Sequence, residues 1–245
     1  MALVLISAPG ALAAPAEGPV TVVIAPDAPE LEKFAANELC GYLNKLFGVD
    51  VTPAPSIAGS AKAVFLIGNP TTNLLVSKTD FPSVSDQGII VKSVAIDGRP
   101  TLIVGGGSAQ ATLWAVYDLV ERWGVRYLLH GDVLPARRAF EMPTLNVAEE
   151  PNLRVRQWRV LNEHAMGPIS WGMADYKPVI DQLAKLRFNR LLLYIWPGQP
   201  FLPLEHKGIK QTSGTLFFGH HYPITDNMVG RSLFGTEREF WNPDL

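Results

Sequence analysis

The side chains with the clearest capacity for chemistry follow two strand-like runs in the second half of the chain. Asn162, Glu163 and His164 come directly after the first run, and Trp196 ends the second. Asparagine, glutamate and histidine can hydrogen-bond hydroxyl groups, and tryptophan offers a flat apolar face that suits a sugar ring. These four residues are therefore the predicted substrate-binding set, for a carbohydrate. The alternatives are a helix cap and turn at the first two residues, and core or loop packing of His164 and Trp196.

A run of glycines suggests a second kind of chemistry, the binding of a phosphate group. Gly105–Ser108 lies between a strand-like run and a helix-like run, as phosphate-binding loops do. The dinucleotide fingerprint needs glycine or alanine where this chain has Gln110, and the preceding strand belongs to a predicted hairpin rather than to a βαβ unit. We interpret the glycines as a tight turn that lets the following helix dock against a sheet, and we predict no cofactor.

The pair His220 and His221, taken with Asp226, has the residue types of a metal site without the spacing. Adjacent residues of a strand point to opposite sides, and the third group does not lie at the helical i+4 position. We therefore predict no metal. The single cysteine, Cys40, excludes an internal disulfide, and its apolar neighbours predict a buried packing role.

The first 150 residues alternate strands with two helices. The predicted strands are Val20–Ile24, Val49–Thr52, Ala63–Ile67, Gly88–Ile96, Thr101–Val104 and Val125–Leu129. Asp97–Pro100 is a turn signal, so the fourth and fifth strands are predicted to form a hairpin. A helix capped by Ser108 and ending at Gly124 follows them. Its inward residues are predicted to be Leu113, Trp114, Tyr117, Val120 and Trp123.

The other helix of this region is predicted between the first two strands. Asp27 is expected to cap it, with Glu30 three residues later. An apolar stripe at three-and-four spacing is formed by Leu31, Phe34, Ala35, Leu39, Tyr42, Leu43 and Leu46, and Gly48 suits the residue after the helix end. Strands, a hairpin and two helices in this order are typical of an α+β domain.

The pattern changes near residue 150, where a strand, a helix and a second strand follow one another. Arg154–Leu161 reads as a strand, and Leu191–Trp196 is a continuous apolar run typical of a strand buried on both faces. Between them Asp175 is expected to cap a helix whose inward residues are Val179, Ile180, Leu183 and Leu186. This order is one βαβ unit, so we expect a parallel sheet or barrel to begin near residue 152.

Chain length decides how much of a barrel this region can form. A (β/α)₈ barrel takes roughly 250 residues, whereas about 95 of the 245 residues follow position 150. The predicted fold is therefore an α+β domain followed by the first βα units of an incomplete (β/α)₈ barrel. We divide the chain into a leader at 1–14, the α+β domain at 15–150 and the start of the barrel at 151–245, as the N-terminal piece of a longer enzyme.

Composition and charge exclude several classes of partner. The chain has 21 Lys and Arg against 23 Asp and Glu, a net charge of −2, and its basic residues are scattered rather than clustered as nucleic-acid binding requires. A hydrophobic content of 47% excludes a disordered chain. No window after the first few residues reaches the roughly 18 apolar residues of a membrane span. We predict neither a nucleic-acid nor a membrane partner, and no particular oligomeric state.

The N-terminus has features of a secretory leader. Met1–Ala14 contains no charged side chain, includes the apolar run Ala2–Ile6 and ends in the small residues of a signal-peptidase site. We expect cleavage after Ala13 and a secreted or periplasmic protein. The positive segment that usually precedes the apolar run is missing, because the first basic residue is Lys33. An unstructured leader is the alternative.

Three segments together resemble the start of known glycoside hydrolases. The most specific is Gly105–Tyr127, which reads GGGSAQATLWAVYDLVERWGVRY and combines the glycine turn, the helix and a Gly-Val-Arg-Tyr strand. Val20–Phe47 resembles the first strand and helix of the same domain, and Asn152–Trp196 resembles the first two strands of a barrel. The chain is thus similar to β-N-acetylhexosaminidases and α-glucuronidases, with their small α+β domain before the catalytic barrel.

This resemblance implies a glycoside hydrolase acting on O-glycosyl bonds of polysaccharides or glycans. In these families the first domain supports the barrel, and the catalytic carboxylates come from later strands. The catalytic residues are therefore expected beyond Leu245, and this chain alone is expected to be inactive. One alternative is a non-catalytic carbohydrate-binding or structural module. A nucleotide-dependent oxidoreductase is a third, weaker class, against which Gln110 argues.

Overall fold

The chain divides into two compact units in the computed structural model, which describes residues 19–159, 173–192, 204–211, 221–227, 231, 236 and 238–241. The first unit comprises Met1–Arg126 and Val133–Arg154, and the second comprises Tyr127–Asp132 and Val155–Leu245. Across these described ranges, no helix has both the length and the apolar character needed to span a membrane.

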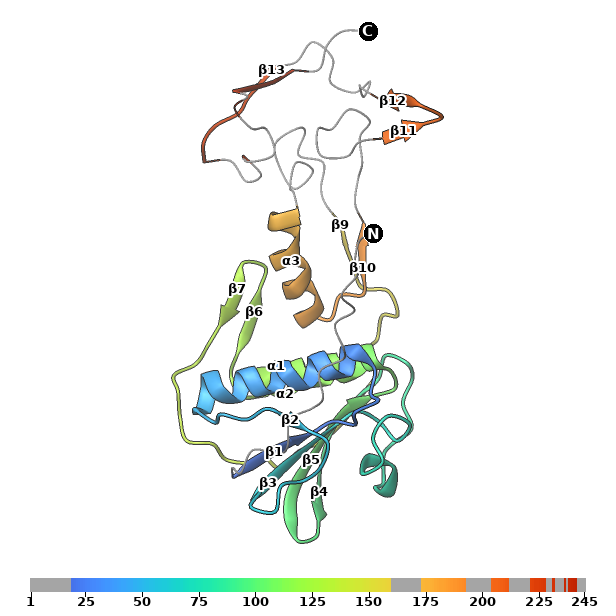
Figure 1. Ribbon diagram of the computed structural model, residues 1–245, viewed down its shortest axis with the longest axis vertical. Helices are drawn as coiled ribbons and strands as arrows, with labels where there is room; N and C mark the ends of the chain where they lie inside the picture. The colour runs from blue at the N-terminus through green and yellow to red at the C-terminus, as the bar shows by residue number, and fades with distance from the viewer. Residues whose placement is uncertain are drawn as a thin grey trace, which may run out of the picture. The chain divides into compact units, whose positions relative to one another are not determined.

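A six-stranded mixed sheet forms the base of the first unit (Figure 1). In spatial order the strands are β2 (Pro53–Ala54), β1 (Val20–Val23), β3 (Ala63–Ile67), β5 (Arg99–Gly106), β4 (Ile89–Ile96) and β8 (Asn146–Glu149). β2, β1, β3 and β5 run parallel, whereas β4 is antiparallel to both of its neighbours. This mixed order fits the predicted α+β class.

The hairpin of β4 and β5 lies where the sequence predicts it. Its turn is only two residues long, because Asp97 and Gly98 both have positive φ, 51° and 74°, and the ladder already pairs Ile96 with Arg99. This is the backbone of a type I′ turn, whose twist matches that of the two strands. The predicted strand Val49–Thr52 is wrong. These residues instead connect the end of the first helix to the sheet, and the chain joins the sheet edge only at Pro53, opposite Val22.

The predicted strand Val125–Leu129 is confirmed as β6 (Arg126–Leu128), which pairs with β7 (Gly131–Val133) and does not join the six-stranded sheet. The strand that completes the sheet is β8, which the sequence analysis missed. β8 is a mostly exposed edge strand, so its residues carry no apolar run that would reveal it.

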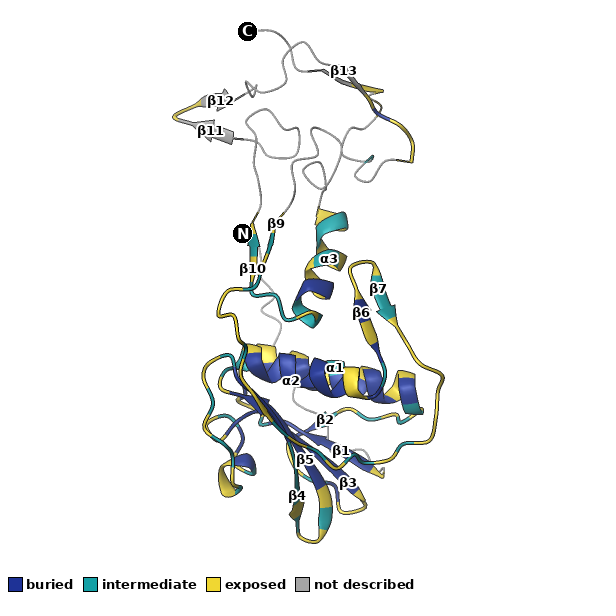
Figure 2. Cartoon of the chain, turned by 180° about the vertical axis from the view of Figure 1, so that it is seen from behind, coloured by how far each residue is buried: buried dark blue, intermediate teal, exposed yellow. Residues whose placement is uncertain are grey.

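Helices α1 (Glu30–Phe47) and α2 (Ala109–Arg122) pack side by side over one face of this sheet (Figure 1). Ser108 caps α2 as predicted, its hydroxyl accepting a hydrogen bond from the Ala111 N–H at 3.1 Å. All residues from Ala111 to Val120 are buried, as the dark blue of α2 in Figure 2 shows. The predicted inward residues of this helix are therefore confirmed, and a helix that is apolar on every side is expected to be buried.

The two ends of α1 differ in how well the sequence predicts them. Gly48 ends the helix as expected, with φ of 72° and its N–H donating to the Asn44 carbonyl at 2.9 Å. The expected cap at Asp27 is wrong, because Pro29 occupies the N-cap position and makes no side-chain bond. Its carbonyl instead accepts hydrogen bonds from the Glu32 and Lys33 N–H groups.

The predicted apolar stripe of α1 is confirmed at five of its seven residues, Ala35, Leu39, Tyr42, Leu43 and Leu46, which are buried. Leu31 and Phe34, expected to face inward, are 38% and 48% exposed. The stripe instead begins at Glu32, which is completely buried, and continues along the helix. Its other members are Ala35, Ala36, Leu39, Cys40, Tyr42, Leu43 and Leu46. The buried packing role predicted for Cys40 is confirmed, and burial raises the pKa of its thiol to about 12.

Loops cover the other face of the sheet. Val64 and Leu66 of β3 pack with Val76, which belongs to the short 3₁₀ helix η1 (Val76–Lys78), and with two alanines of a preceding loop, Ala58 and Ala61. With helices on one face and loops on the other, the parallel strands are buried on both sides. Their continuous apolar runs follow from that position.

The glycines around the end of β5 are a point of close main-chain contact. A Cβ at Gly105 would lie 2.0 Å from the Gly68 carbonyl oxygen, and one at Gly107 would lie 1.9 Å from the Ser85 carbonyl oxygen. At Gly106 the nearest atom would be the Ala111 Cβ, at 2.5 Å. No side chain fits at these three positions. Gly105 and Gly106 are the last two residues of β5, so the predicted tight turn is limited to Gly107 and Ser108. The predicted docking of α2 against the sheet is confirmed by the close approach of Gly106 and Ala111.

The second unit contains the predicted βαβ arrangement. β9 (Gln157–Arg159), α3 (Met173–Lys185) and β10 (Arg190–Leu192) follow one another, and the two strands pair in parallel. Leu191 lies opposite Trp158. Two antiparallel pairs complete the described part of this unit: β11 (Leu204–His206) with β12 (Ile209–Gln211), and β13 (His221–Pro223) with β14 (Glu239–Trp241).

Burial in the βαβ arrangement is less complete than predicted. Leu183 of α3 is buried, but Ile180 and Leu186 are exposed, and Asp175 lies inside the first turn rather than at the cap. Leu192 of β10 is 37% exposed. The expected strand buried on both faces is therefore not found in the described part of β10, because β9 is its only strand partner there.

Two glycine-to-alanine changes, one beside the end of β5 and one in α1, are expected to have opposite effects on the free energy of unfolding. Gly107→Ala should destabilise the protein by at least about 2 kcal/mol, because the new methyl group would overlap the Ser85 carbonyl. Gly41→Ala is the matched control, since Gly41 lies in α1 with open space around it. It should stabilise the protein by about 0.5–1 kcal/mol. Urea unfolding followed by tryptophan fluorescence measures both. A Gly107→Ala protein as stable as the parent would contradict the packing described.

Candidate functional site

The carboxyl ends of β9 and β10 form the edge at which the sequence predicts a site. The register pairs Arg159, the last residue of β9, with Leu192, the last residue of β10, so both strands end at the same edge. In α/β barrels, this edge carries the catalytic and binding residues. All four predicted site residues, Asn162, Glu163, His164 and Trp196, lie outside the described residues.

Hydrogen bonds lock the opposite, amino-terminal edge of the same two strands. Arg156 precedes β9, and its N–H donates to the Asn189 side-chain oxygen at 2.9 Å. The Asn189 N–H returns a bond to the Arg156 carbonyl at 3.0 Å. The Arg156 guanidinium donates to the Arg187 carbonyl at 2.6 Å, and burial together with the Arg187 charge lowers its pKa. Residues at this edge therefore hold the two strands in register.

A partly buried ion pair fixes α3 to β7. The Lys185 ammonium lies 2.9 Å from the Asp132 carboxylate, and both side chains are almost enclosed. The Gln182 amide donates to the same carboxylate at 3.0 Å. The Lys185 ammonium also lies 5.9 Å from the centre of the Tyr127 ring. Breaking one partner of such a pair leaves a charge uncompensated, so this cluster has a structural role.

Of the histidine pair considered as a metal site, the structure describes only the main chain of His221. His221 lies in β13, and His220 is outside the described part of the chain. Asp226 accepts hydrogen bonds from Arg238 and lies 3.5 Å from the Arg231 guanidinium, contacts that lower the pKa of its carboxyl group. In the regions that the structure describes, no three His, Cys, Asp or Glu residues gather closely enough to hold a metal ion.

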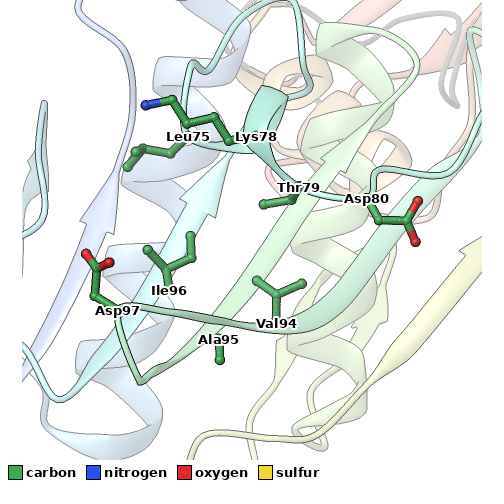
Figure 3. Close-up of a pocket in the computed structure, with 8 residues that line it drawn as sticks. All are labelled: Leu75, Lys78, Thr79, Asp80, Val94, Ala95, Ile96 and Asp97. Carbon is green, nitrogen blue, oxygen red and sulfur yellow. The ribbon is translucent and has the colours of Figure 1, made fainter.

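A pocket of about 410 Å³ opens on the loop-covered face of the first unit (Figure 3). Val94 and Ile96 point into it from β4, and Leu75 faces them. The carboxyl group of Asp80 points away and pairs with Lys92 at 2.8 Å. Its lining also includes Lys78, Thr79, Asp80 and Asp97, so half of its eight lining residues are polar or charged.

Glu32 is the most unusual titratable group of the first unit. It is 0% exposed, and its Oε1 accepts a hydrogen bond from the Thr112 hydroxyl at 3.2 Å. Its other oxygen has no hydrogen bond among the described residues. Burial raises the pKa of Glu32, and the hydroxyls of Thr112 and Thr72 oppose this only in part. A carboxyl group closed off from solvent cannot exchange protons with a substrate, so Glu32 links α1 to α2 and has no catalytic role.

The sequence contains a signal for the burial of Glu32, which the sequence analysis missed. Glu32, Ala36, Leu39 and Leu43 are spaced by four, three and four residues, the spacing of one helix face. The spacing of these four residues, rather than the acidic character of Glu32, predicts that its side chain is buried.

Comparisons with known proteins identify the fold through structure alone. No protein-family model matches the sequence, and no curated protein sequence matches it either. The structure is similar to that of a family GH115 4-O-methyl-α-glucuronidase with specificity for decorated arabinogalactans, with a TM-score of 0.57 and 13% identity. The match covers 74% of this chain and 26% of that enzyme, so the chain spans about a quarter of its length.

Two further enzymes match more weakly. A GH138 enzyme targeting pectin rhamnogalacturonan II has a TM-score of 0.47 and 15% identity, over 71% of this chain and 18% of that one. An N-acetyl-β-hexosaminidase of Streptomyces plicatus has a TM-score of 0.46 and 14% identity, over 76% of this chain and 32% of that one. The structural match to the GH115 enzyme confirms the resemblance predicted from sequence, at the level of a glycoside hydrolase-like fold.

The buried carboxyl group predicts how stability depends on pH. Because the pKa of Glu32 is raised in the folded state, its contribution to the free energy of unfolding is fully present below pH 4.5, the pKa of the unfolded state. This contribution is lost as the pH rises through the folded-state pKa. Glu32→Gln removes the ionisation and keeps the shape. At pH 7.5 the variant should be more stable than the parent by on the order of 1 kcal/mol, and this advantage should disappear at pH 4.

Chemical unfolding at the two pH values measures this difference. The matched control is Glu30→Gln, since Glu30 lies in the same turn but on the exposed side, where its pair with Lys33 contributes less than about 0.5 kcal/mol. If Glu32→Gln lost stability at pH 7.5, Glu32 would be a charged residue that the fold requires, and the account of its burial would be wrong.

Proposed function

We propose that this chain is the N-terminal portion of a glycoside hydrolase that cleaves O-glycosyl bonds of polysaccharides or glycans. The observation that carries the proposal is the parallel β9–α3–β10 arrangement following an α+β unit, in a chain whose fold is similar to part of an α-glucuronidase. A βαβ unit of this kind is the building block of a (β/α)₈ barrel, the scaffold of many sugar-cleaving enzymes.

The proposed substrate contacts follow from chain order. Asn162, Glu163 and His164 come after β9, and Trp196 comes after β10. At the carboxyl edge of a barrel the first three would hydrogen-bond sugar hydroxyls, and the indole would stack on the sugar ring. Hydrolysis also needs two carboxyl groups that flank the scissile bond. We assign these to residues beyond Leu245, so that the 245-residue chain alone is inactive.

A non-catalytic carbohydrate-binding or structural module is the second candidate. The observation in its favour is that the first unit has its own sheet, helices and two packed faces, independent of any barrel. For either candidate we propose that the protein is secreted or periplasmic, with a leader at residues 1–14 that is cleaved after Ala13. Sequencing the N-terminus of the exported protein should then give Ala14 as the first residue, whereas a product that retains Met1 would contradict the leader.

The reading frame around this chain distinguishes the hydrolase from the module. If the proposal is right, the natural gene continues in frame past Leu245 for about 150 or more residues, enough to complete a barrel. The protein from that complete frame should release the chromophore from at least one member of a panel of nitrophenyl glycosides, and the 245-residue chain should release none. A stop codon directly after Leu245, or a complete protein inactive on the panel and on plant and microbial polysaccharides, would favour the module.

Within the complete enzyme, Glu163 and Asn162 are expected to bind substrate without transferring protons. Losing one hydrogen bond to a sugar hydroxyl costs about 1–3 kcal/mol, or roughly 5- to 150-fold in kcat/KM. Glu163→Gln and Asn162→Ala should therefore remain active within that range. Steady-state kinetics measures the effect, with Asp27→Asn in an exposed turn of the first unit as the control. Activity abolished in Glu163→Gln and restored by added azide would show that Glu163 is catalytic.

A further inference from the structure

A cavity of the first unit lies where the C-terminal ends of α1 and α2 meet the segment leading to β8. Its volume is about 440 Å³, within the range of sites for small ligands. The side chains that define its chemistry are Phe47, Arg122, Trp123, Arg138, Glu141 and Met142. All of them belong to the first unit, so the cavity does not depend on the second.

One wall of the cavity is an ordered aromatic cluster. The Phe47 ring meets the Trp123 ring edge-on, with 5.1 Å between their centres, and meets Phe140 at 5.4 Å. The Arg138 guanidinium lies over the Phe47 ring, 5.8 Å from its centre. These contacts fix the orientation of Phe47, which is only half-buried. A fixed aromatic ring at the cavity wall offers the apolar surface on which the C–H face of a sugar can pack.

The same wall holds hydrogen-bonding capacity that the protein does not use. Trp123 is 6% exposed, and its indole N–H is closed off from solvent, so this group offers no donor to a ligand in the cavity. Arg138 makes one long hydrogen bond, 3.4 Å, to the Trp123 carbonyl. Glu141 adds an exposed carboxylate, which can accept hydrogen bonds from hydroxyl groups.

The charges around the cavity favour a neutral ligand. Arg122 is already held by the Asp118 carboxylate at 2.6 Å and the Glu149 carboxylate at 3.0 Å. The other charged groups in the wall are Arg138 and Glu141, whose charges are opposite. The site therefore combines donors, an acceptor and an aromatic ring without an excess of positive charge. That set suits the hydroxyl groups of a neutral sugar better than a phosphate or a free carboxylate.

We propose that this cavity binds one neutral monosaccharide unit of a glycan and is a non-catalytic subsite on the first unit. The proposal rests on the carbohydrate function proposed above and adds a second place at which the glycan is held. Phe47 provides the stacking surface, Arg138 donates hydrogen bonds, and Glu141 accepts them. A second contact on the same glycan would raise the effective concentration of substrate near the barrel.

Saturation-transfer NMR on the 245-residue chain tests the subsite. The probes are the methyl glycosides of β-glucose, β-galactose and β-N-acetylglucosamine, with sodium glucuronate and inorganic phosphate as charged comparisons. At least one neutral glycoside should receive saturation at millimolar concentration. Arg138→Ala and Glu141→Gln should each weaken its binding at least fivefold. Arg137→Ala is the matched control, because Arg137 also donates to a main-chain carbonyl, that of Asn44, but does not line the cavity. It should bind as the parent does.

Several results would overturn the proposal. They are an absence of saturation on every neutral glycoside, binding of the charged probes alone, and binding unchanged in Arg138→Ala while thermal unfolding shows that variant to be folded. The outcome is separable from the test of the hydrolase, because the binding assay needs no catalytic residue. A complete enzyme that hydrolyses glycosides while the cavity binds none would remove the subsite and leave the hydrolase intact.

Discussion

Contact between main chains at Gly105, Gly106 and Gly107 is the constraint on which the first unit depends. Because these residues have no Cβ, the end of β5 lies against Gly68, and the chain at Ser85 lies against the turn. α2 can therefore start directly on the sheet, where ten consecutive residues from Ala111 to Val120 become buried. With α2 in place, α1 packs beside it, and the Thr112 hydroxyl reaches the buried carboxyl group of Glu32.

The segment that closes the glycine turn also fixes the point at which the chain leaves the first unit. The Ser85 N–H donates to the Glu150 carboxylate at 2.6 Å, a contact that lowers the pKa of Glu150 together with the Ser85 hydroxyl. The Gln87 side chain donates to the Arg154 carbonyl at 3.1 Å. Arg154 is the last residue of the first unit before β9. The segment that contacts the glycines therefore also holds Glu150 and Arg154, near the end of the first unit.

Features that depend on short-range chemistry could be predicted from the sequence, and features that depend on long-range packing could not. Ser108 as a cap, the turn at Asp97 and Gly98 and the parallel pairing of β9 with β10 follow from local patterns and the rules for βαβ units. β8 could not be recognised, because an exposed edge strand lacks an apolar signature. The chemistry of the cavity at Trp123 was also hidden, since it arises where two helix ends and a distant segment meet. For the proposed site, the residues and their chain order come from the sequence, and the structure describes β9 and β10, which precede them in the chain.

A crystal structure of the complete protein, soaked with the sugar that its hydrolysis releases, tests the central claim most directly. The account predicts further parallel strands beside β10 and a sugar ring at the carboxyl edge, with Glu163 or Asn162 within hydrogen-bond distance of its hydroxyl groups. A sugar bound at the amino-terminal edge, where Arg156 and Asn189 hold the strands together, would contradict this assignment. So would a second unit in which no further strand joins β9 and β10.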